Sequence, residues 1–100
     1  MENFRTFNLA ADFYRQCRKL PLKGHLKDQL LRAAMSIALN LAEGRGKPTT
    51  KDQLRFFHIA MGSLRECQAF LIIAERKGSA EWRMLDYLGA SLYRLIQNAA

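Results

Sequence analysis

The sequence predicts an all-α protein, folded as an up-down-up-down antiparallel four-helix bundle in one domain of residues 1–100. Leu and Ala supply 28 residues, whereas β-branched Ile and Thr supply eight and Val none. Helices favour Leu and Ala and strands favour branched side chains, so this composition excludes a β protein. Strong helix breakers cluster at three places and divide the chain into four segments. Because the connections are short, consecutive helices should lie antiparallel.

The first two helices are predicted over about residues 3–20 and 26–43, on either side of Pro21 and Gly24. In each segment apolar side chains recur at steps of three and four residues, which gathers them on one helical face. In the first segment these residues are Phe7, Ala10, Ala11, Tyr14 and Cys17. In the second segment they are Leu30, Ala34, Ile37 and Leu41. Gly44 is predicted to end the second helix, because glycine is common at the C′ position.

The third helix is predicted over about residues 51–77, and Gly78 is predicted to end it. Thr50 and Gln53 have the spacing of a capping box, which satisfies free N–H groups at a helix start. Apolar residues form one stripe of Leu54, Phe57, Met61, Leu64 and Leu71 and a second of Phe56, Ala60, Cys67, Phe70 and Ala74. A monomeric bundle needs one wide stripe per helix, so the second stripe predicts a homo-oligomer. A central position in an irregular bundle is the alternative.

The fourth helix is predicted over about residues 80–99, with Ser79 as its N-cap. Its apolar residues follow the alternating steps of a bundle seam: Leu85, Leu88, Leu92, Leu95 and Ala99. Trp82, near its start, is predicted to anchor the packing. The two cysteines, Cys17 and Cys67, lie 50 positions apart on apolar faces. They are expected to be small core residues rather than a disulfide framework.

A strip of polar side chains follows one face of the second predicted helix, and the third offers a partial counterpart. The strip consists of Gln29, Arg32, Ser36, Asn40 and Glu43, and its counterpart of Arg55, Gly62, Ser63 and Glu66. Steps of three and four residues keep the strip on one side. We favour a structural network or a solvated face, because carboxylates and arginines on adjacent helices commonly pair. A catalytic or ligand-binding groove remains the other interpretation.

This segment resembles a known family. It is similar to the pattern Q-x-x-R-A-x-x-S-I-x-x-N-I-A-E-G of four-helix-bundle proteins first noted as open reading frames in intervening sequences of bacterial 23S ribosomal RNA genes. The matching positions are Gln29, Arg32, Ala33, Ser36, Ile37, Asn40, Ala42, Glu43 and Gly44, and Leu41 replaces Ile. The family's next pattern, R-F-L-x-x-A-x-G-S-x-x-E, is matched at Arg55, Phe56, Ala60, Gly62, Ser63 and Glu66, and Phe57 replaces Leu.

The resemblance extends from about Phe4 to Ile96. It implies an all-α bundle assembled as a homopentamer around a central axis, and hence a homo-oligomeric ring. It also implies kinship to the accessory variability determinant protein of diversity-generating retroelements, a basic pentamer that works with a reverse transcriptase and its RNA. The resemblance transfers no catalytic residue to this chain.

Basic residues concentrate at the predicted end of the bundle where the first and third helices end and the second and fourth begin. This set, the basic pole, consists of Arg15, Arg18, Lys19, Lys23, Lys27, Arg76, Lys77 and Arg83. With Asp28, Glu75 and Glu81 at the same end, it holds +5 of the net charge of +7. We expect it to bind nucleic-acid phosphates, with generic solubility as the alternative. Because aromatic residues are not interleaved with this set, we expect backbone contact rather than base stacking.

The sequence lacks the spacing of the common catalytic, cofactor and metal sites. The run from Gly44 to Thr49 has neither the spacing nor the preceding strand of a phosphate-binding loop. His25 is expected in an exposed loop and His58 partly buried beside the core, and neither has a second metal ligand at suitable spacing. We therefore expect no cofactor, no metal and no enzymatic activity. A helical nuclease is the weakest alternative, because only two residues separate Arg55 from His58.

The longest uncharged run, residues 33–42, has 10 residues, whereas a bilayer span needs about 18 or more. No secretion signal is recognised after Met1, so we expect a cytoplasmic protein. The leading hypothesis is a non-enzymatic, oligomeric accessory protein that binds nucleic acid, RNA in particular, and partners a reverse transcriptase or another nucleic-acid enzyme. The alternative is a protein-interaction scaffold whose basic pole docks an acidic protein surface.

Overall fold

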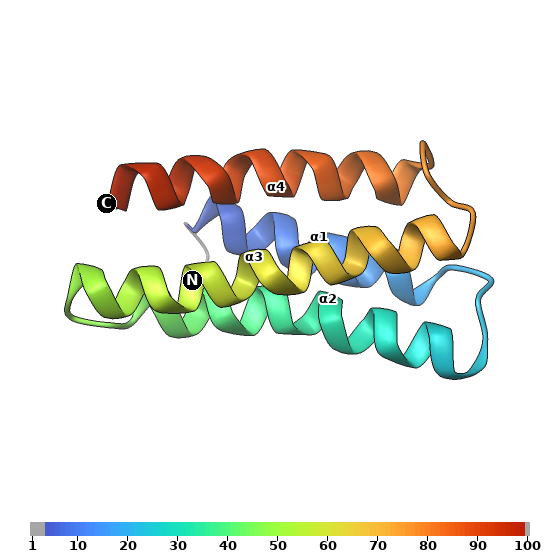
Figure 1. The fold of residues 1–100 in the computed structure, drawn as a ribbon, viewed down its shortest axis with the longest axis horizontal. Coiled ribbons are helices and arrows are strands. Elements are labelled where there is room, and N and C mark those ends of the chain that lie inside the picture. The colour runs from blue at the N-terminus through green and yellow to red at the C-terminus, as the bar shows by residue number, and fades with distance from the viewer. Residues whose placement is uncertain (1–3, 100) are drawn as a thin grey trace.

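The structure, a computed structural model that describes residues 4–99, is a bundle of four long helices (Figure 1). The helices are α1 (Arg5–Arg18), α2 (Gly24–Arg45), α3 (Thr50–Ile73) and α4 (Ala80–Ala99). Each helix runs antiparallel to the next, and α4 closes the bundle by packing against α1. Residues 4–99 contain no strand, so the predicted all-α bundle is confirmed. The predicted first residue of α1, residue 3, and the domain ends at 1–3 and 100 lie outside the described residues.

One stripe of each helix faces the bundle axis and forms the core. On α3 this stripe combines Phe57, Leu64 and Leu71 with Ala60 and Cys67 of the second predicted stripe, so the prediction that the second stripe is left for another subunit was wrong. Its large, fully buried apolar members are Phe13, Leu30, Ile37, Leu41, Leu71, Leu85, Leu88 and Leu92. Burial of each such side chain contributes about 1.5–3 kcal/mol relative to exposure. Cys17 and Cys67 lie in the same core as free thiols, which agrees with the prediction that they are core residues. Trp82 packs against the edge of this core, also as predicted.

The end of α3 lies four residues before its predicted position. Glu75 adopts the left-handed conformation, with a φ of 60°. Its N–H donates to the Ile72 carbonyl at 3.0 Å, and the N–H of Arg76 donates to the Leu71 carbonyl at 2.8 Å. These bonds form a Schellman motif, which satisfies carbonyls at the helix end. The prediction that Gly78 ends α3 was wrong because a residue with a Cβ takes that place, at a cost of about 1–2 kcal/mol.

Gly44 lies inside α2 instead of ending it. The helix continues to Arg45, and Gly46 is the C-cap with a φ of −83°. A Cβ on Gly44 would lie 2.7 Å from Cε1 of Phe57 and 3.1 Å from the Gln53 carbonyl oxygen. Gly44 therefore allows α2 and α3 to approach closely. The predicted C′ role was wrong because a sequence does not distinguish glycine needed for space from glycine needed for a positive φ.

The N-cap of α3 is Thr49, one residue before the predicted Thr50. The Thr49 hydroxyl accepts a hydrogen bond from the Asp52 N–H at 3.2 Å, whereas the Gln53 side chain donates to a carbonyl of the preceding loop at 2.8 Å. The predicted capping box of Thr50 and Gln53 was therefore wrong, and a single N-cap bond takes its place. Ser79 caps α4 as predicted, because its hydroxyl accepts the N–H three residues later at 3.2 Å. The bounds of α1 and α2 lie within two residues of the prediction, and those of α4 coincide with it.

Among residues 4–99, α3 is the one helix long and apolar enough to cross a bilayer by length and composition alone. The uncharged runs did not indicate this, because Arg65 and Glu66 interrupt the segment. The core helix of a soluble bundle passes the same test, and here α3 packs against α2 and α4. Buried residues make up 33% of the apolar window, so part of its apolar surface faces outward.

Candidate nucleic-acid interface

The structure gathers the basic pole at one end of the bundle, shown at the right of Figure 1. Helices α1 and α3 end there, α2 and α4 begin there, and the loops of residues 19–23 and 74–79 connect them. Lys27 and Arg76 are half-buried. The exposed members of the basic pole are Arg15, Arg18, Lys19, Lys23, Lys77 and Arg83.

Several of these cations have partners within the chain. Nζ of Lys27 donates to a carbonyl of the α1–α2 loop at 3.0 Å, and Nη1 of Arg83 donates to a carbonyl of the α3–α4 loop at 2.7 Å. Both bonds hold a loop against the helix that follows it. Nη1 of Arg15 lies 2.9 Å from Oδ1 of Asp12 in an exposed ion pair. Such a pair contributes about 1 kcal/mol or less, so it weakly offsets the Arg15 charge.

Arg76 is bound to a buried carboxylate. Glu81 is 2% exposed, and Nε of Arg76 donates to its Oε2. Burial by itself raises the pKa of the Glu81 carboxyl. Hydrogen bonds from Arg76, from the Glu81 backbone N–H and from Ser79, together with the Arg76 charge, outweigh burial and hold that pKa below its usual value. Arg76 therefore stabilises the α3–α4 loop, a role that its position in the sequence did not show.

Four cations of the basic pole form neither an ion pair nor a side-chain hydrogen bond among the described residues: Arg18, Lys19, Lys23 and Lys77. All four are exposed, and they come from both loops and from the last turn of α1. Exposed cations without an ion-pair partner keep their charge available to a ligand. Their clustering creates a positive potential that attracts polyanions to this end of the bundle.

A hollow on the last turn of α1 is lined by Arg15, Arg18 and Lys19. A groove between α1 and α2 adjoins it, because Arg15 and Arg18 line the groove as well. The other lining residues are Phe7, Ala11, Tyr14, Met35, Ala38 and Leu39. Tyr14 stands one helical turn before Arg18 and shares its face. The prediction that no aromatic residue is interleaved with the basic pole was therefore wrong for Tyr14.

Hydrogen bonds connect the polar strip of α2 to α3. Nη2 of Arg32 donates to Oε2 of Glu66 at 2.7 Å, and its Nε donates to Oε1 of Gln29 at 2.9 Å. The hydroxyl oxygens of Ser36 and Ser63 lie 2.8 Å apart. The bonds of Arg32 to Glu66 and of Ser36 to Ser63 span the most extensive helix–helix interface of the bundle. The arrangement is that of a network which fixes the register of α2 against α3.

Two other residues of the strip and one of its counterpart on α3 make contacts that do not cross between the helices. Nδ2 of Asn40 donates to the Ser36 carbonyl at 2.9 Å and to its hydroxyl at 3.1 Å, within α2. Glu43 pairs at 3.3 Å with the lysine one turn further on. The guanidinium of Arg55 lies 4.9 Å from the centre of the Phe56 ring. Among the described residues, no buried side-chain nitrogen or oxygen lacks a hydrogen-bond partner.

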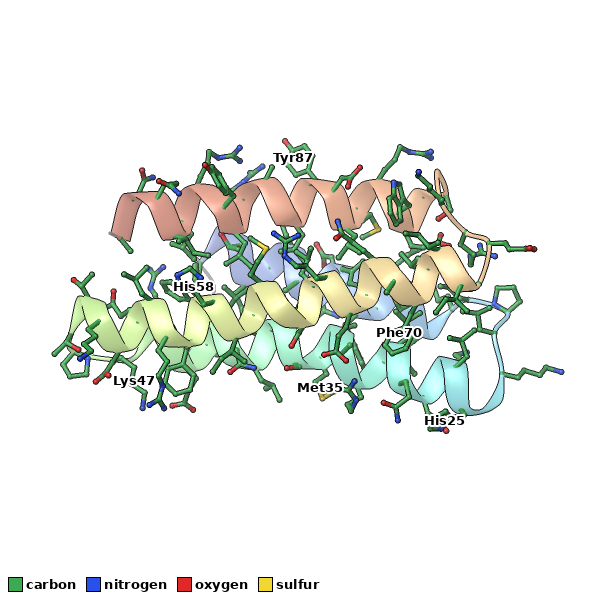
Figure 2. All side chains as sticks on the ribbon, viewed as in Figure 1. His25, Met35, Lys47, His58, Phe70 and Tyr87 are labelled. Carbon is green, nitrogen blue, oxygen red and sulfur yellow. The ribbon has the colours of Figure 1, made fainter. Side chains whose placement is uncertain are left out.

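The histidines and thiols do not come together in a metal site. His25 is exposed in the first turn of α2 rather than in a loop (Figure 2), and His58 is exposed on α3, so its predicted partial burial was wrong. Burial, and then the charge of Glu81, raises the pKa of the Cys17 thiol to about 12. Burial raises the pKa of Cys67 as well. Within residues 4–99, no group of three or more His, Cys, Asp or Glu side chains is placed to hold a metal ion.

Comparison with known proteins assigns this bundle to a family. The family model for 23S rRNA-intervening sequence proteins matches residues 4–97. The chain belongs to this family. The match spans all four helices of this 23S rRNA-intervening sequence protein, so it includes both the basic pole and the polar strip. A comparison with curated proteins finds no match.

Proposed function

We propose that this 23S rRNA-intervening sequence protein is a non-enzymatic accessory protein that binds nucleic acid, RNA in particular. The observation that carries the proposal is the set of exposed, unpaired cations on the basic pole: Arg18, Lys19, Lys23 and Lys77. Cations in this state bind phosphates and release the counterions condensed on a nucleic acid, which is the main source of sequence-independent affinity. Because they come from two loops, they present a broad surface rather than a single anion site.

Two further observations support RNA binding without catalysis. The family name refers to sequences that interrupt 23S ribosomal RNA, which favours RNA as the ligand. The polar strip is the other part of the chain that carries candidate chemistry. Arg32 of α2 bonds to Glu66 of α3, and Ser36 of α2 bonds to Ser63 of α3. These bonds between the helices favour a structural role for the four residues.

We further propose a homo-oligomer, with the pentameric ring that the family resemblance implies. On α3, Ile59, Ile72 and Ile73 are exposed by 45%, 52% and 68%. Ile72 and Ile73 are adjacent at the end of α3, about 20 Å along the helix from Ile59, and apolar side chains exposed side by side are typical of a surface that another subunit covers. Rotational symmetry would repeat the basic pole around one rim of the ring and multiply its phosphate contacts. The partner we propose for this rim is a reverse transcriptase or another nucleic-acid enzyme, in line with kinship to the retroelement accessory protein.

The test of nucleic-acid binding is the salt dependence of affinity for a fluorescent RNA, followed by anisotropy. A triple variant changes Arg18, Lys19 and Lys23 to Gln. If each cation neutralises one phosphate, the slope of log affinity against log salt becomes shallower by about 2–3 for each subunit that contacts the RNA. Binding at one low salt concentration should weaken in parallel.

The matched control changes Arg45, Lys51 and Arg94, at the opposite end of the bundle, to Gln. This variant loses the same three units from the net charge of +7 and should keep a slope close to that of the wild type. Unchanged affinity and slope in the variant of the basic pole would contradict the proposal. Equal losses in both triple variants would show that net charge, rather than this surface, governs binding.

A protein-interaction scaffold is the second candidate, and the exposed isoleucines of α3 favour it. They offer the apolar centre that a protein interface needs. Competition separates the two functions. A protein partner that stays bound in moderate salt and in excess RNA supports the scaffold, whereas displacement of that partner by RNA supports the nucleic-acid role.

A further inference from the structure

The groove between α1 and α2 combines features that suit a ligand with both a flat apolar part and a negative charge. Tyr14 and Arg18 stand one turn apart on α1, and Met35 and Leu39 stand one turn apart on α2. All four line the groove. Met35 is 42% exposed and Leu39 is 60% exposed, so apolar surface is left in water on this side of the bundle. Figure 2 shows Met35 projecting away from the bundle.

The charge in this region lies at one end of the groove. Arg15 and Arg18 belong to both the groove and the adjoining hollow, and Lys19 belongs to the hollow. Asp12 pairs with Arg15, but Arg18 and Lys19 form no ion pair among the described residues. The groove is therefore apolar and aromatic along its length and cationic where it meets the basic pole.

We propose that this groove receives an unpaired nucleobase of a single-stranded nucleic acid, while the flanking phosphates contact Arg18 and Lys19. The inference rests on the proposed nucleic-acid binding and specifies the form of the ligand. The half-buried ring of Tyr14 supplies a face on which a base stacks, and Met35 and Leu39 cover the apolar surface of that base. Stacking on an aromatic side chain beside a cation is the common way in which proteins hold single strands.

The charge of the lining argues for a polyanion as the occupant. Two arginines, Arg15 and Arg18, line the groove, and no carboxylate of residues 4–99 lines it. A polyanion brings opposite charge. A duplex is disfavoured as the occupant, because its bases are stacked on one another and cannot enter a groove without unpairing.

The test compares three fluorescent RNA probes of equal length, about 16 nucleotides each: a single strand with bases, an abasic single strand with the same phosphates, and a duplex. The wild type should bind the base-containing strand about 5- to 150-fold more tightly than the abasic strand for each stacked base. Equal affinity for these two strands, with binding still sensitive to salt, would contradict base binding in the groove. It would remain consistent with phosphate binding by the basic pole. Failure to bind any probe at low salt would overturn the proposed function itself.

Two substitutions locate the base. Tyr14→Leu keeps an apolar side chain against the core but removes the ring, so it should abolish the preference for the base-containing strand and leave abasic affinity unchanged. Leu39→Ser alters an exposed side chain with little risk to folding, and it should reduce the same preference. The matched control is Tyr93→Leu, because Tyr93 is a 59% exposed tyrosine on α4, outside the groove. A preference that survives Tyr14→Leu would overturn the inference.

Cross-linking and mass measurement complete the test. A strand that carries 5-iodouracil should cross-link on irradiation to Tyr14 or Phe7, and not to Tyr93, when the adduct is mapped by peptide mass spectrometry. Cross-links confined to other aromatic residues would contradict the groove. If Tyr14→Leu and Leu39→Ser both change the subunit number, the groove is a subunit contact and the inference fails.

Discussion

Substitution of Gly44 by Ala tests the close approach of α2 and α3. Gly44 lies within a helix, where Ala is preferred over Gly by about 1 kcal/mol. The new Cβ, however, would lie 2.7 and 2.9 Å from two ring carbons of Phe57 and 3.1 Å from the Gln53 carbonyl oxygen. Forcing a methyl group into such a site costs about 1–3 kcal/mol. The clash outweighs the helix preference, so Gly44→Ala should destabilise the protein by up to about 2 kcal/mol.

Two other helical glycines serve as controls. A Cβ on Gly62 of α3 would meet nothing within 4 Å, and one on Gly89 of α4 would lie 3.6 Å from a Leu64 methyl, an ordinary contact. Both Gly→Ala changes should stabilise the protein by about 1 kcal/mol through helix preference alone. In a domain of this size, 1 kcal/mol shifts Tm by about 4–8 °C. Thermal denaturation at one fixed protein concentration therefore measures the difference.

The sign of the Tm shift shows whether α2 and α3 approach closely at Gly44. Gly44→Ala should lower Tm, whereas Gly62→Ala and Gly89→Ala should raise it. If all three variants gain the same stability, α2 and α3 do not approach as closely as the structure shows, and the reasoning fails. A urea titration should give the same order with an unchanged m-value, since surface exposed on unfolding hardly differs among the variants.

Four further predictions concern three residues, Glu75, Glu81 and Cys17, whose conformation or ionisation depends on the fold. Glu75→Gly should stabilise the protein by about 1 kcal/mol, because glycine tolerates the positive φ at the end of α3, whereas Glu75→Gln, with the same change in charge, should not. Glu81→Ala should cost about 3 kcal/mol by leaving Arg76 unpaired. Because the pKa of Glu81 is lowered on folding, the wild type's advantage over Glu81→Gln should be full above the usual pKa of 4.5 and shrink as pH falls below it, in denaturation series at several pH values. Cys17, with a pKa of about 12, should react with a thiol reagent at pH 8 only as fast as the protein unfolds.

The sequence was sufficient for the number, order and type of the helices, because breakers and apolar periodicity act locally. It misjudged features that depend on tertiary distance. The roles of Gly44 and Glu75 follow from the ring of Phe57 and from the path of the α3–α4 loop, neither of which leaves a local pattern. The buried bond between Thr6 and Ser91, at 2.8 Å, joins residues from opposite ends of the chain and was missed for the same reason.

For the candidate interface, the sequence was sufficient to locate the basic pole. It did not show which of the cations form bonds within the chain. The bundle topology alone places these cations at one end. Whether a cation is free depends on what the folded loops place beside it, as the buried Glu81 next to Arg76 illustrates. The sequence shows that Tyr14 and Arg18 lie one turn apart on a helix. It does not show that Met35 and Leu39 of α2 complete a groove beside them.

The central claim is that this protein carries nucleic acid on the basic pole. The measurement that tests it most directly is native mass spectrometry of protein purified from cells without nuclease treatment or high-salt washing, since it reports subunit number and bound polyanion together. We expect an oligomer that retains RNA or DNA, and we expect the Arg18, Lys19 and Lys23 triple variant to lose this cargo while it keeps its subunit number. An oligomer or monomer of wild-type protein free of nucleic acid would contradict the central claim.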